Sequence, residues 1–405
     1  MIALLVLFVA VAGTVTSSIF FGMVVFAARR FSRAARREAL LPPPGDRARS
    51  LQPLSVLKPV HGMEPRLRGN LESFFLQDYP DFEIIFGARH AEDPALDIVR
   101  DLSRKYPHVR IRVVLSGDPP WPNAKVFSLA KMIASAAHRL LIISDSDVHV
   151  ARDYLREVVR PLLDETVGLV TCVYRGVPVG GLWSRLEALG MSVEMTSGVL
   201  VADMLEGMKF ALGPTMATRR ECLEKIGGIG KTADYYSDDY ELGRLIHIAG
   251  YKVVLSHHII EHIVTARSLV KSLAHQIRWM KSTRYSRPRG HVGTGLTFAM
   301  PYALLGLAGG IAVANLPLGF FLLGWGLLNR MLQSLVVGWG IVRDPRARTF
   351  FWLYPVRDLV GFLLWCGSFR GGRFVWRGEH YRFQRGGRIL AERPAGSRNS
   401  AASNR

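Results

Sequence analysis

Apolar residues form long runs near both ends of the chain and short runs between them. Residues 1–28 contain no charged side chain, and roughly 20 residues suffice to cross the hydrocarbon core of a bilayer. A cleaved signal peptide is the alternative, but there the positive charge precedes the apolar core instead of following it. A second apolar block, residues 296–342, is interrupted near Asn315 and Pro317. These patterns predict an N-terminal transmembrane helix and a later hairpin of two membrane helices.

A third apolar block, residues 350–369, has Arg357 and Asp358 at its centre. Because a charged pair is costly in lipid, we expect a re-entrant or interfacial segment in which the two side chains pair or face a cavity. An ordinary fourth span is the alternative. The positive-inside rule places both basic segments, residues 29–52 and 370–405, in the cytoplasm. A full span at 350–369 would instead put residues 370–405 on the opposite side of the membrane.

Residues 53–265 alternate between strand-like and helical stretches. Runs such as FEIIFGA and VRIRVVLS are separated by stretches such as AKVFSLAKMIASAAHR. Such alternation is typical of an α/β domain with a mostly parallel sheet and helices on both faces, in which ligands bind beyond the carboxyl ends of the strands. The sequence has no GxxxxGK[ST] loop and no GxGxxG, which excludes a P-loop and weakens a dinucleotide-binding interpretation.

The charge balance indicates the kind of partner. The 405 residues include 52 Lys and Arg against 33 Asp and Glu, a formal net charge of +19. This excess indicates either nucleic acid or an anionic membrane surface, and because 49% of the residues are hydrophobic we favour the membrane and expect no nucleic acid. Cys172, Cys222 and Cys366 are far apart, so neither a zinc site nor a disulfide framework is predicted.

Two carboxylates follow the fourth strand-like run, in the sequence RLLIISDSDVHV. Asp145 and Asp147 have a simple explanation as turn residues. At a strand end, however, one carboxylate can face a ligand while the other reaches a divalent cation such as Mg²⁺ or Mn²⁺ that bridges a diphosphate. Lys58 and Lys125 also lie near predicted strand ends and could contact phosphate, although a solvated surface lysine is the simpler interpretation of each.

Two further segments carry candidate chemistry. Asp238 and Asp239 open a predicted helix, where they are either N-terminal capping residues or, for one of them, a general base; the spacing does not decide. Residues 266–295 predict an interfacial helix with the sequence HQIRW. In this helix Arg278, beside Trp279, could offset charge on a leaving diphosphate.

The motifs together resemble a known family. They are LKPVHGMEPRLRGNLESFFLQDYPDFEIIFGA, SDSDVHV, GPTMATRRECLEKIGG, DDYELG, HQIRWMKSTR and VWRGEHYRF. This set resembles the inverting glycosyltransferases of the GT-A fold that act on lipids, and among them the ceramide glucosyltransferase family (glycosyltransferase family 21) with its bacterial relatives that glycosylate hopanoids. The resemblance covers nearly the whole chain after the first apolar segment and implies a GT-A domain, with a Rossmann-like sheet, for residues 53–265.

The resemblance assigns roles to residues that match the family's motifs. Asp145 matches an aspartate of the nucleotide-sugar site, and Asp147 is the implied ligand of a divalent cation, Mg²⁺ or Mn²⁺. Asp239 matches the aspartate assigned as the general base. Arg278 and Trp279 match the (Q/R)xxRW element, which closes over the donor diphosphate and lies near the acceptor.

Two positions depart from the family pattern. The aspartate that follows the second strand and holds uridine is replaced by His90, with Glu92 and Asp93 just beyond, so we expect the uracil contact to come from one of these three residues. The first residue of the (Q/R)xxRW element is His275 here; we assign the donor contact to Gln276, which is next to it.

The resemblance implies transfer of a sugar from a UDP-sugar, with glucose as the family default, to the hydroxyl of a membrane lipid, with ceramide as the expected acceptor. Residues 195–215 are expected to line the acceptor entrance. The alternatives are a hopanoid or another lipid acceptor with UDP-GlcNAc or another UDP-sugar, a polysaccharide synthase, and an inactive membrane scaffold.

The expected location is a bacterial inner membrane, with the catalytic domain in the cytoplasm. Inverting transfer forms no covalent intermediate, so no nucleophilic Ser or Cys is expected.

Overall fold

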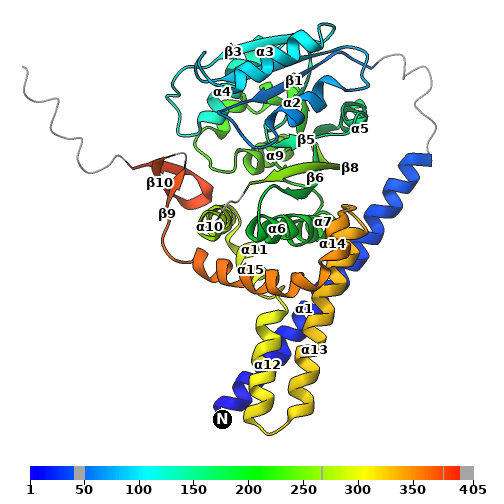
Figure 1. The fold of residues 1–405 in the computed structure, drawn as a ribbon, viewed down its shortest axis with the longest axis vertical. Helices are drawn as coiled ribbons and strands as arrows, with labels where there is room; N and C mark the ends of the chain where they lie inside the picture. The colour runs from blue at the N-terminus through cyan, green and yellow to red at the C-terminus, as the bar shows by residue number, and fades with distance from the viewer. Residues whose placement is uncertain (41–50, 266–267, 377, 393–405) are drawn as a thin grey trace, which may run out of the picture.

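The computed structural model describes residues 1–40, 51–265, 268–376 and 378–392. An α/β domain stands above a group of long helices, and a small sheet covers one side of the domain (Figure 1). Parts of the predicted basic segments, residues 41–50 and 393–405, lie outside the described residues.

The α/β domain is built on an eight-stranded sheet of the described residues, in the order β3-β2-β1-β4-β7-β6-β8-β5. Only β7 and β5 run opposite to the other strands of this sheet. The predicted fold class, α/β with a mostly parallel sheet, is therefore confirmed. The strands are β1 (Leu54–Pro59), β2 (Phe82–Ala88), β3 (Arg110–Leu115), β4 (Leu140–Ile143), β5 (Val148–His149), β6 (Val167–Pro178), β7 (Met216–Arg219) and β8 (Lys252–Val264).

Helices cover both faces of the sheet, as the alternating pattern predicts. Successive residues of a strand point to opposite faces, so Val56 of β1 packs into the core beneath α2 and α3, whereas Leu57 packs into the core beneath α4. The helices of the domain are α2 (Leu67–Phe75), α3 (Ala95–Lys105), α4 (Ala124–Ser135), α5 (Tyr154–Val159), α6 (Leu182–Leu189), α7 (Thr196–Glu206), α8 (Arg220–Lys225) and α9 (Asp238–Ile248).

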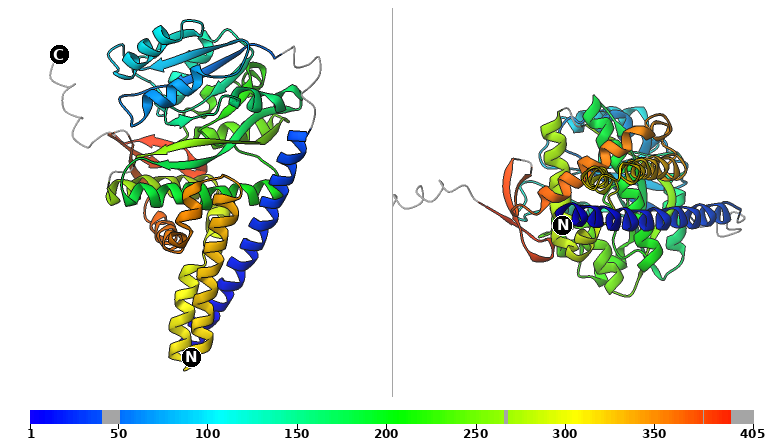
Figure 2. Two further views of the ribbon diagram at one scale, coloured as in Figure 1. Left: turned by 45° about the vertical axis from the view of Figure 1, so that its right-hand side comes forward. Right: turned by 90° about the horizontal axis from the view of Figure 1, so that it is seen from below.

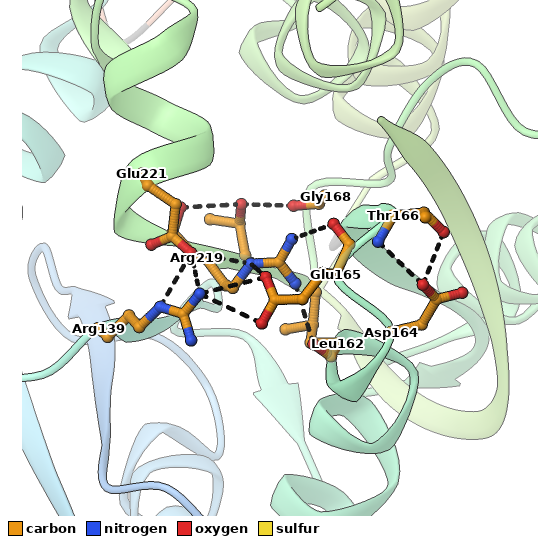
Figure 3. A network of polar contacts seen from close by, with 9 residues as sticks. Arg139, Leu162, Asp164, Glu165, Thr166, Gly168, Arg219 and Glu221 are labelled. Atoms are coloured by element: carbon orange, nitrogen blue, oxygen red, sulfur yellow. Dashed lines mark hydrogen bonds and ion pairs between the residues drawn. The ribbon is translucent and has the colours of Figure 1, made fainter. Parts of the chain in front are cut away.

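A polar network fixes the antiparallel strand β7 within the sheet (Figure 3). Arg219, the last residue of β7, is 1% exposed, and its guanidinium donates to the carbonyl oxygens of Leu162 at 2.9 Å and Glu165 at 2.8 Å. Glu221 lies 3.0 Å from Nε of Arg219 and accepts a hydrogen bond from Nε of Arg139 at 2.9 Å. A buried guanidinium needs such partners, and the network joins β7 to the segments that precede β4 and β6.

Three helices of the described residues are long and apolar enough to cross a membrane, judged by length and composition. They are α1 (Ile2–Leu40), the continuous helix Leu182–Glu206, and Leu316–Trp339. The first and the third run side by side away from the α/β domain (Figures 1 and 2). The sequence predicts both of these, but it does not predict the middle one.

The predicted hairpin consists of α12 (Met300–Ala312) and α13 (Leu316–Gln333), which pack against each other and against α1. The side chain of Asn315 accepts a hydrogen bond from the backbone N–H of Leu318 at 3.2 Å, and Pro317 occupies the first turn of α13. Asn is a favourable N-cap and Pro is favourable in a first helical turn. The turn therefore forms at the position that the sequence indicates.

The third apolar block forms α15 (Tyr354–Ser368), which lies across the end of the hairpin, between the hairpin and the α/β domain (Figure 1). An α-helix of this length reaches about 22 Å, short of a hydrocarbon core of about 30 Å. Asp358 pairs with Arg330 at 3.1 Å, and Arg357 pairs with Glu194 at 3.0 Å. Both charged residues are paired, as expected for a segment that does not expose them to lipid.

The apolar helix over residues 182–206 consists of α6, a π-helical turn (Gly190–Met195) and α7. It lies beneath the sheet and roughly across the direction of the hairpin (Figure 1). Of its most apolar window, 61% is buried inside the protein. Most of its apolar surface therefore packs against the rest of the chain.

The C-terminal region forms a second, three-stranded antiparallel sheet, in the order β11-β10-β9. It follows α15 and lies beside α10 (Figure 1). Its strands are β9 (Arg373–Trp376), β10 (Glu379–Phe383) and β11 (Ile389–Ala391), and the remaining helices of this half of the chain are α10 (Leu269–Ser286), α11 (Pro288–Thr294) and α14 (Pro345–Thr349).

Candidate active site

A cavity of about 630 Å³ opens at the carboxyl ends of the parallel strands. Its walls come from the residues that follow β1, β2, β3 and β4, the first turns of α4 and α9, one face of α10, and Trp376 of β9. This is the position at which open α/β sheets bind ligands. Elements from the whole length of the chain after the first helix therefore meet at one site.

The acidic turn after β4 forms one wall of the cavity. Asp145 Oδ1 lies 2.6 Å from Lys125 Nζ, and Asp238 Oδ2 lies 3.7 Å from the same ammonium. The side chain of Asn123 accepts the backbone N–H of Lys125 at 3.1 Å and so caps the start of α4. This contact holds Lys125 in place. Burial would lower the pKa of Lys125, but the two carboxylates outweigh burial and raise that pKa. The cavity thus contains a permanent cation between acidic residues.

Asp147 is the residue of this turn that is free to bind a cation. Its Oδ1 is buried without a hydrogen-bond partner among the described residues, and its Oδ2 lies 3.7 Å from His262 Nε2. The carboxylate fits Mg²⁺ or Mn²⁺, which prefer oxygen ligands, whereas an imidazole is the commoner ligand of softer divalent ions. The described part of the chain has no group of three or more His, Cys, Asp or Glu placed to hold a metal. A bound ligand would therefore complete the coordination.

Lys58 lies beneath the acidic turn and does not line the cavity. Its side chain is fully buried, and its ammonium donates to the carbonyl oxygen of Asp145 and to Ser144 Oγ at 3.4 Å. Burial lowers the pKa of Lys58 to about 7, although Asp145 and Asp147 act in the opposite direction. The predicted contact of Lys58 with a bound phosphate is corrected: β1 is hydrogen-bonded to β4, so this lysine supports the turn from below.

Asp239 faces the acidic turn from the start of α9. Its Oδ2 accepts the backbone N–H of Gly213 at 2.7 Å. A Cβ added at Gly213 would lie 3.2 Å from Asp239 Oδ2 and 3.5 Å from Asp145 Oδ2, so glycine leaves room between the two carboxylates. The loss of water and the charge of Asp238 raise the pKa of Asp239 to about 6, against the effect of Lys125. A carboxylate with such a pKa is suited to accept a proton near neutral pH.

One face of α10 forms the opposite wall. His275, Arg278, Trp279 and Ser282 all line the cavity, since residues three, four and seven apart share one face of a helix. Arg278 is held from behind: its Nε donates to the hydroxyl of Tyr236 at 2.6 Å, and its Nη1 donates to a backbone carbonyl of β9 at 3.4 Å. The guanidinium is therefore oriented before any ligand binds.

Gln276, predicted to contact the donor, points away from the cavity. It is 7% exposed, and its Nε2 donates to Ser272 Oγ at 2.9 Å. The predicted donor contact of Gln276 is therefore corrected. Gln276 follows His275, and one residue along a helix turns the side chain by about 100°. Gln276 thus points away from the face that carries His275 and Arg278. The neighbouring His275 occupies the cavity wall instead.

The three candidates after β2 also lie outside the cavity wall. His90 and Glu92 are exposed, and the carboxylate of Asp93 accepts the backbone N–H of Gly62 at 2.9 Å and of Ala95 at 3.0 Å. Asp93 thus stabilises the local loop. The expected contact of one of these residues with a base stays a prediction: β2 ends at Ala88, and the next residue, Arg89, lines the cavity.

Several residues of the site carry no sequence signal strong enough to find them. Arg89, Tyr236, His262 and Trp376 all line the cavity. Arg89 directly follows a predicted strand, which is a weak signal. Tyr236 and Trp376 come from segments 140 residues apart, and only the folded chain shows that they meet: their ring centroids are 5.1 Å apart.

The mostly parallel sheet and the acidic and basic walls of this cavity fit a sugar-transferring enzyme, and the family match shows that class. The sequence model of Glycosyl transferase family 21 matches residues 10–389, and the chain belongs to this family. The chain is 26% identical to "Ceramide glucosyltransferase 1" of Caenorhabditis elegans over 84% of its own length and 73% of that protein. It is also 35% identical to "Ceramide glucosyltransferase" of Komagataella phaffii over 32% of its own length and 25% of that protein.

Solved structures also match this chain, at low identity. One of them is a mannosyltransferase from Pyrobaculum calidifontis in complex with GDP-Man and Mn²⁺, which is 20% identical to this chain. The match covers 88% of this chain and 99% of that one, with a TM-score of 0.46.

Proposed function

We propose that the protein is an inverting glycosyltransferase that transfers glucose from UDP-glucose to the hydroxyl of ceramide in a membrane. The observation that carries this proposal is the convergence on one cavity of Asp145, Asp147, Asp239, Lys125 and Arg278. The relatives named ceramide glucosyltransferases support the choice of donor and acceptor.

In the proposed reaction the acceptor hydroxyl attacks the anomeric carbon and UDP leaves from the opposite side of the sugar. Asp239 takes the proton of the hydroxyl, since its carboxylate lies at the cavity wall and its pKa is raised to about 6. Arg278 and Lys125 stabilise the negative charge that develops on the departing diphosphate. Asp145, held 2.6 Å from Lys125, binds the donor sugar.

A divalent cation, Mg²⁺ or Mn²⁺, would be held by Asp147 together with His262. The unpartnered Oδ1 of Asp147 supports this assignment. When bound, such a cation neutralises part of the charge on the diphosphate of the donor. The protein's own contribution is to orient the donor between the acidic turn and α10.

The helices beneath the domain suit a lipid acceptor. Removing an acyl chain from a bilayer costs about 0.8 kcal/mol for each methylene that water then surrounds. The cavity is lined by α10 and by Met195 of the helix Leu182–Glu206, and both helices lie directly above α15 and the hairpin (Figure 1), which allows the acceptor to keep its chains in lipid. Met195, Gly213 and Pro214 line the cavity, which supports the proposed acceptor entrance at residues 195–215.

The proposed topology places the catalytic domain in the cytoplasm, at a bacterial inner membrane. Its support is the basic sequence after the apolar part of α1 and the basic C-terminal segment, which the positive-inside rule assigns to that side and which anionic lipids attract. Residues 350–369 are proposed to lie at the interface.

The purified protein, incubated with a panel of UDP-sugars and with ceramide or total lipid extract, tests the proposal by mass spectrometry of the products. We expect hexosylceramide from UDP-glucose. The variant Asp239→Asn should still bind UDP but lose transfer by at least about 100-fold, because a general base contributes on the order of 10²–10⁴-fold. Normal turnover by this variant would refute the assigned base, and product only on a hopanoid would refute the assigned acceptor.

A further inference from the structure

Glu187, in α6, is a buried carboxylate that belongs to none of the sequence motifs. Its side chain is 2% exposed. Ser272 Oγ donates to its Oε2 at 2.6 Å, and His275 Nδ1 lies 2.9 Å from its Oε1. Gln276 Nε2 in turn donates to Ser272 Oγ at 2.9 Å. One turn of α10 thus satisfies both oxygens of Glu187, as burial of a charge requires.

His275 joins this buried carboxylate to the cavity. Its side chain is 38% exposed, it lines the cavity, and its ring centroid lies 4.2 Å from that of Trp279. Nδ1 carries the ring proton, because a nitrogen lone pair would repel the carboxylate oxygen beside it. In the neutral ring the other nitrogen, Nε2, is then a hydrogen-bond acceptor.

We propose that Glu187 fixes His275 as a hydrogen-bond acceptor for a second polar hydrogen of the lipid, the other O–H or the amide N–H of a ceramide and not the hydroxyl whose proton Asp239 takes, so that the two residues form an acceptor-binding subsite. This inference rests on the proposed function and adds to it the group that recognises this second polar hydrogen. In this subsite Glu187 is a positioning residue, since it acts through His275.

The chemistry of Nε2 favours an alcohol over a phosphate. The oxygens of a diphosphate carry no hydrogen at neutral pH and need donors, which Lys125 and Arg278 supply on the same cavity. A lone pair on Nε2 would repel these oxygens, whereas it binds an O–H group.

The position of the subsite agrees with an acceptor that arrives from the membrane. Glu187 lies on α6 and His275 on α10, and both helices lie between the large sheet and α15 (Figures 1 and 2). Trp279 packs against the imidazole with the two rings tilted by 51°, and Met195 and Tyr174 line the same cavity. The subsite thus places a hydrogen-bond acceptor beside an aromatic side chain, which suits a polar group at the end of a hydrocarbon chain.

The variant Glu187→Gln provides the sharpest test. Its amide can donate to Nδ1, which moves the ring proton to Nε2 and removes the hydrogen-bond acceptor. We expect the KM for the lipid to rise about 10-fold, as for the loss of one hydrogen bond, while the KM for the UDP-sugar changes less than about 2-fold. The measurement uses full-length protein in detergent with short-chain ceramide, or with the lipid alcohol of the extract from which the wild type forms product.

Two variants of the histidine make the test independent of how Glu187→Gln folds. His275→Phe keeps a ring against Trp279 but has no acceptor atom, so it should raise the lipid KM as much as Glu187→Gln does. His275→Gln can donate to Glu187 and still accept a hydrogen bond from the lipid through its carbonyl oxygen, so it should restore a lipid KM near that of the wild type. His257→Gln is the matched control, because His257 also pairs with a glutamate, Glu38, at 2.5 Å, but outside this cavity.

The outcomes separate this inference from the proposed function. An unchanged lipid KM in both Glu187→Gln and His275→Phe would overturn the subsite. An equal rise in the donor and lipid KM values would also overturn it, since that pattern indicates a general disturbance of the cavity. If the wild type transfers no sugar to any lipid while it still binds UDP, the proposed function fails, and that result is visible before any variant is made.

Discussion

At the scale of single residues, the site depends on how negative charge is distributed around Lys125. Asp145 lies 2.6 Å from its ammonium and Asp238 lies 3.7 Å from it, so two of the acidic groups are compensated. Within the described part of the chain, Asp239 has no such ion-pair partner and instead accepts two backbone N–H groups, from Gly213 and from Tyr240, each at 2.7 Å. The desolvation of Asp239 and the nearby charge of Asp238 raise the pKa of Asp239 to about 6.

This arrangement predicts the pH dependence of turnover. A general base works only when it is deprotonated, so kcat/KM for the lipid should be constant well above pH 6, fall to half near pH 6, and drop about 10-fold for each further pH unit. Asp238→Asn removes the neighbouring negative charge, which lowers the pKa of Asp239, and should therefore shift this acidic limb to lower pH. A limb that stays in place in Asp238→Asn would contradict the proposed coupling of the two residues.

The roles assigned to the site residues stay predictions, whereas the structure shows which of these residues line the cavity. Asp145, Asp147, Asp239, Lys125, Arg278 and Trp279 line the cavity as expected. A motif predicts these residues because strand ends and helix starts converge in this kind of sheet. The motif does not give the direction of each side chain: Lys58 lies beneath its turn, and Asp93 binds backbone N–H groups of its own loop.

At the scale of elements, the small C-terminal sheet completes the site. The sequence predicts this region only as a basic tail, because its strands are short and rich in arginine, which gives little apolar alternation to recognise. In the structure, Tyr236 packs edge-on against Phe374, Trp376 and Phe383 of this sheet. Its hydroxyl accepts the hydrogen bond from Arg278. The sheet therefore fixes the arginine that we assign to the departing diphosphate.

The variant Tyr236→Phe removes only the hydroxyl group. A hydrogen bond to a charged group contributes about 1.5–3 kcal/mol, so we expect kcat to fall about 10-fold or more, with the thermal unfolding temperature nearly unchanged because the ring contacts remain. Tyr235→Phe is the matched control: its hydroxyl also accepts a hydrogen bond from an arginine, Arg388, at 3.3 Å, but away from the cavity. Equal activity of the two variants would show that the contact to Arg278 does not matter.

The strands were predicted with uneven success. The sequence indicates β1, β2, β3, β4 and β6. The apolar runs of β1, β2, β4 and β6 are buried on both faces, whereas β3, at the edge of the sheet, is largely exposed. The sequence does not indicate β5, β7 or β8. β5 and β7 are too short to show a period, and β8 carries several histidines and a glutamate among its apolar residues. Their pairing within the sheet, and not their own composition, makes these segments strands.

At the scale of the whole molecule, buried charges join the hairpin to the helix beneath the α/β domain. Asp358 of α15 pairs with Arg330 of α13 at 3.1 Å, and both side chains are 2–3% exposed. The second oxygen of Asp358 accepts the backbone N–H groups of Ala299 and Met300, at 3.0 and 2.8 Å, where α12 begins. One carboxylate therefore connects three helices.

Removal of this carboxylate should destabilise the arrangement of the helices. Asp358→Leu leaves Arg330 buried without its partner, which we expect to cost about 3–5 kcal/mol of stability, measured by thermal or denaturant unfolding in detergent. The double variant Arg330→Met/Asp358→Leu should recover part of the loss, because no unpaired charge remains. Asp97→Ala, at an exposed ion pair with Arg100, is the control and should not change stability measurably. A double variant less stable than Asp358→Leu would contradict this account.

The sequence by itself determined the class of the sheet, the helices at both ends of the chain, the family and the principal acidic and basic residues of the site. These depend on local composition, hydrophobic period and motif, which are properties of neighbouring positions. Only the tertiary structure decided that the apolar helix over residues 182–206 lies against the domain, that Lys58 and Gln276 are supporting residues, and that Glu187, Tyr236 and Asp358 hold the site and the helices together. Each of these depends on contacts between segments far apart in the chain, and such contacts arise only when packing brings the segments together.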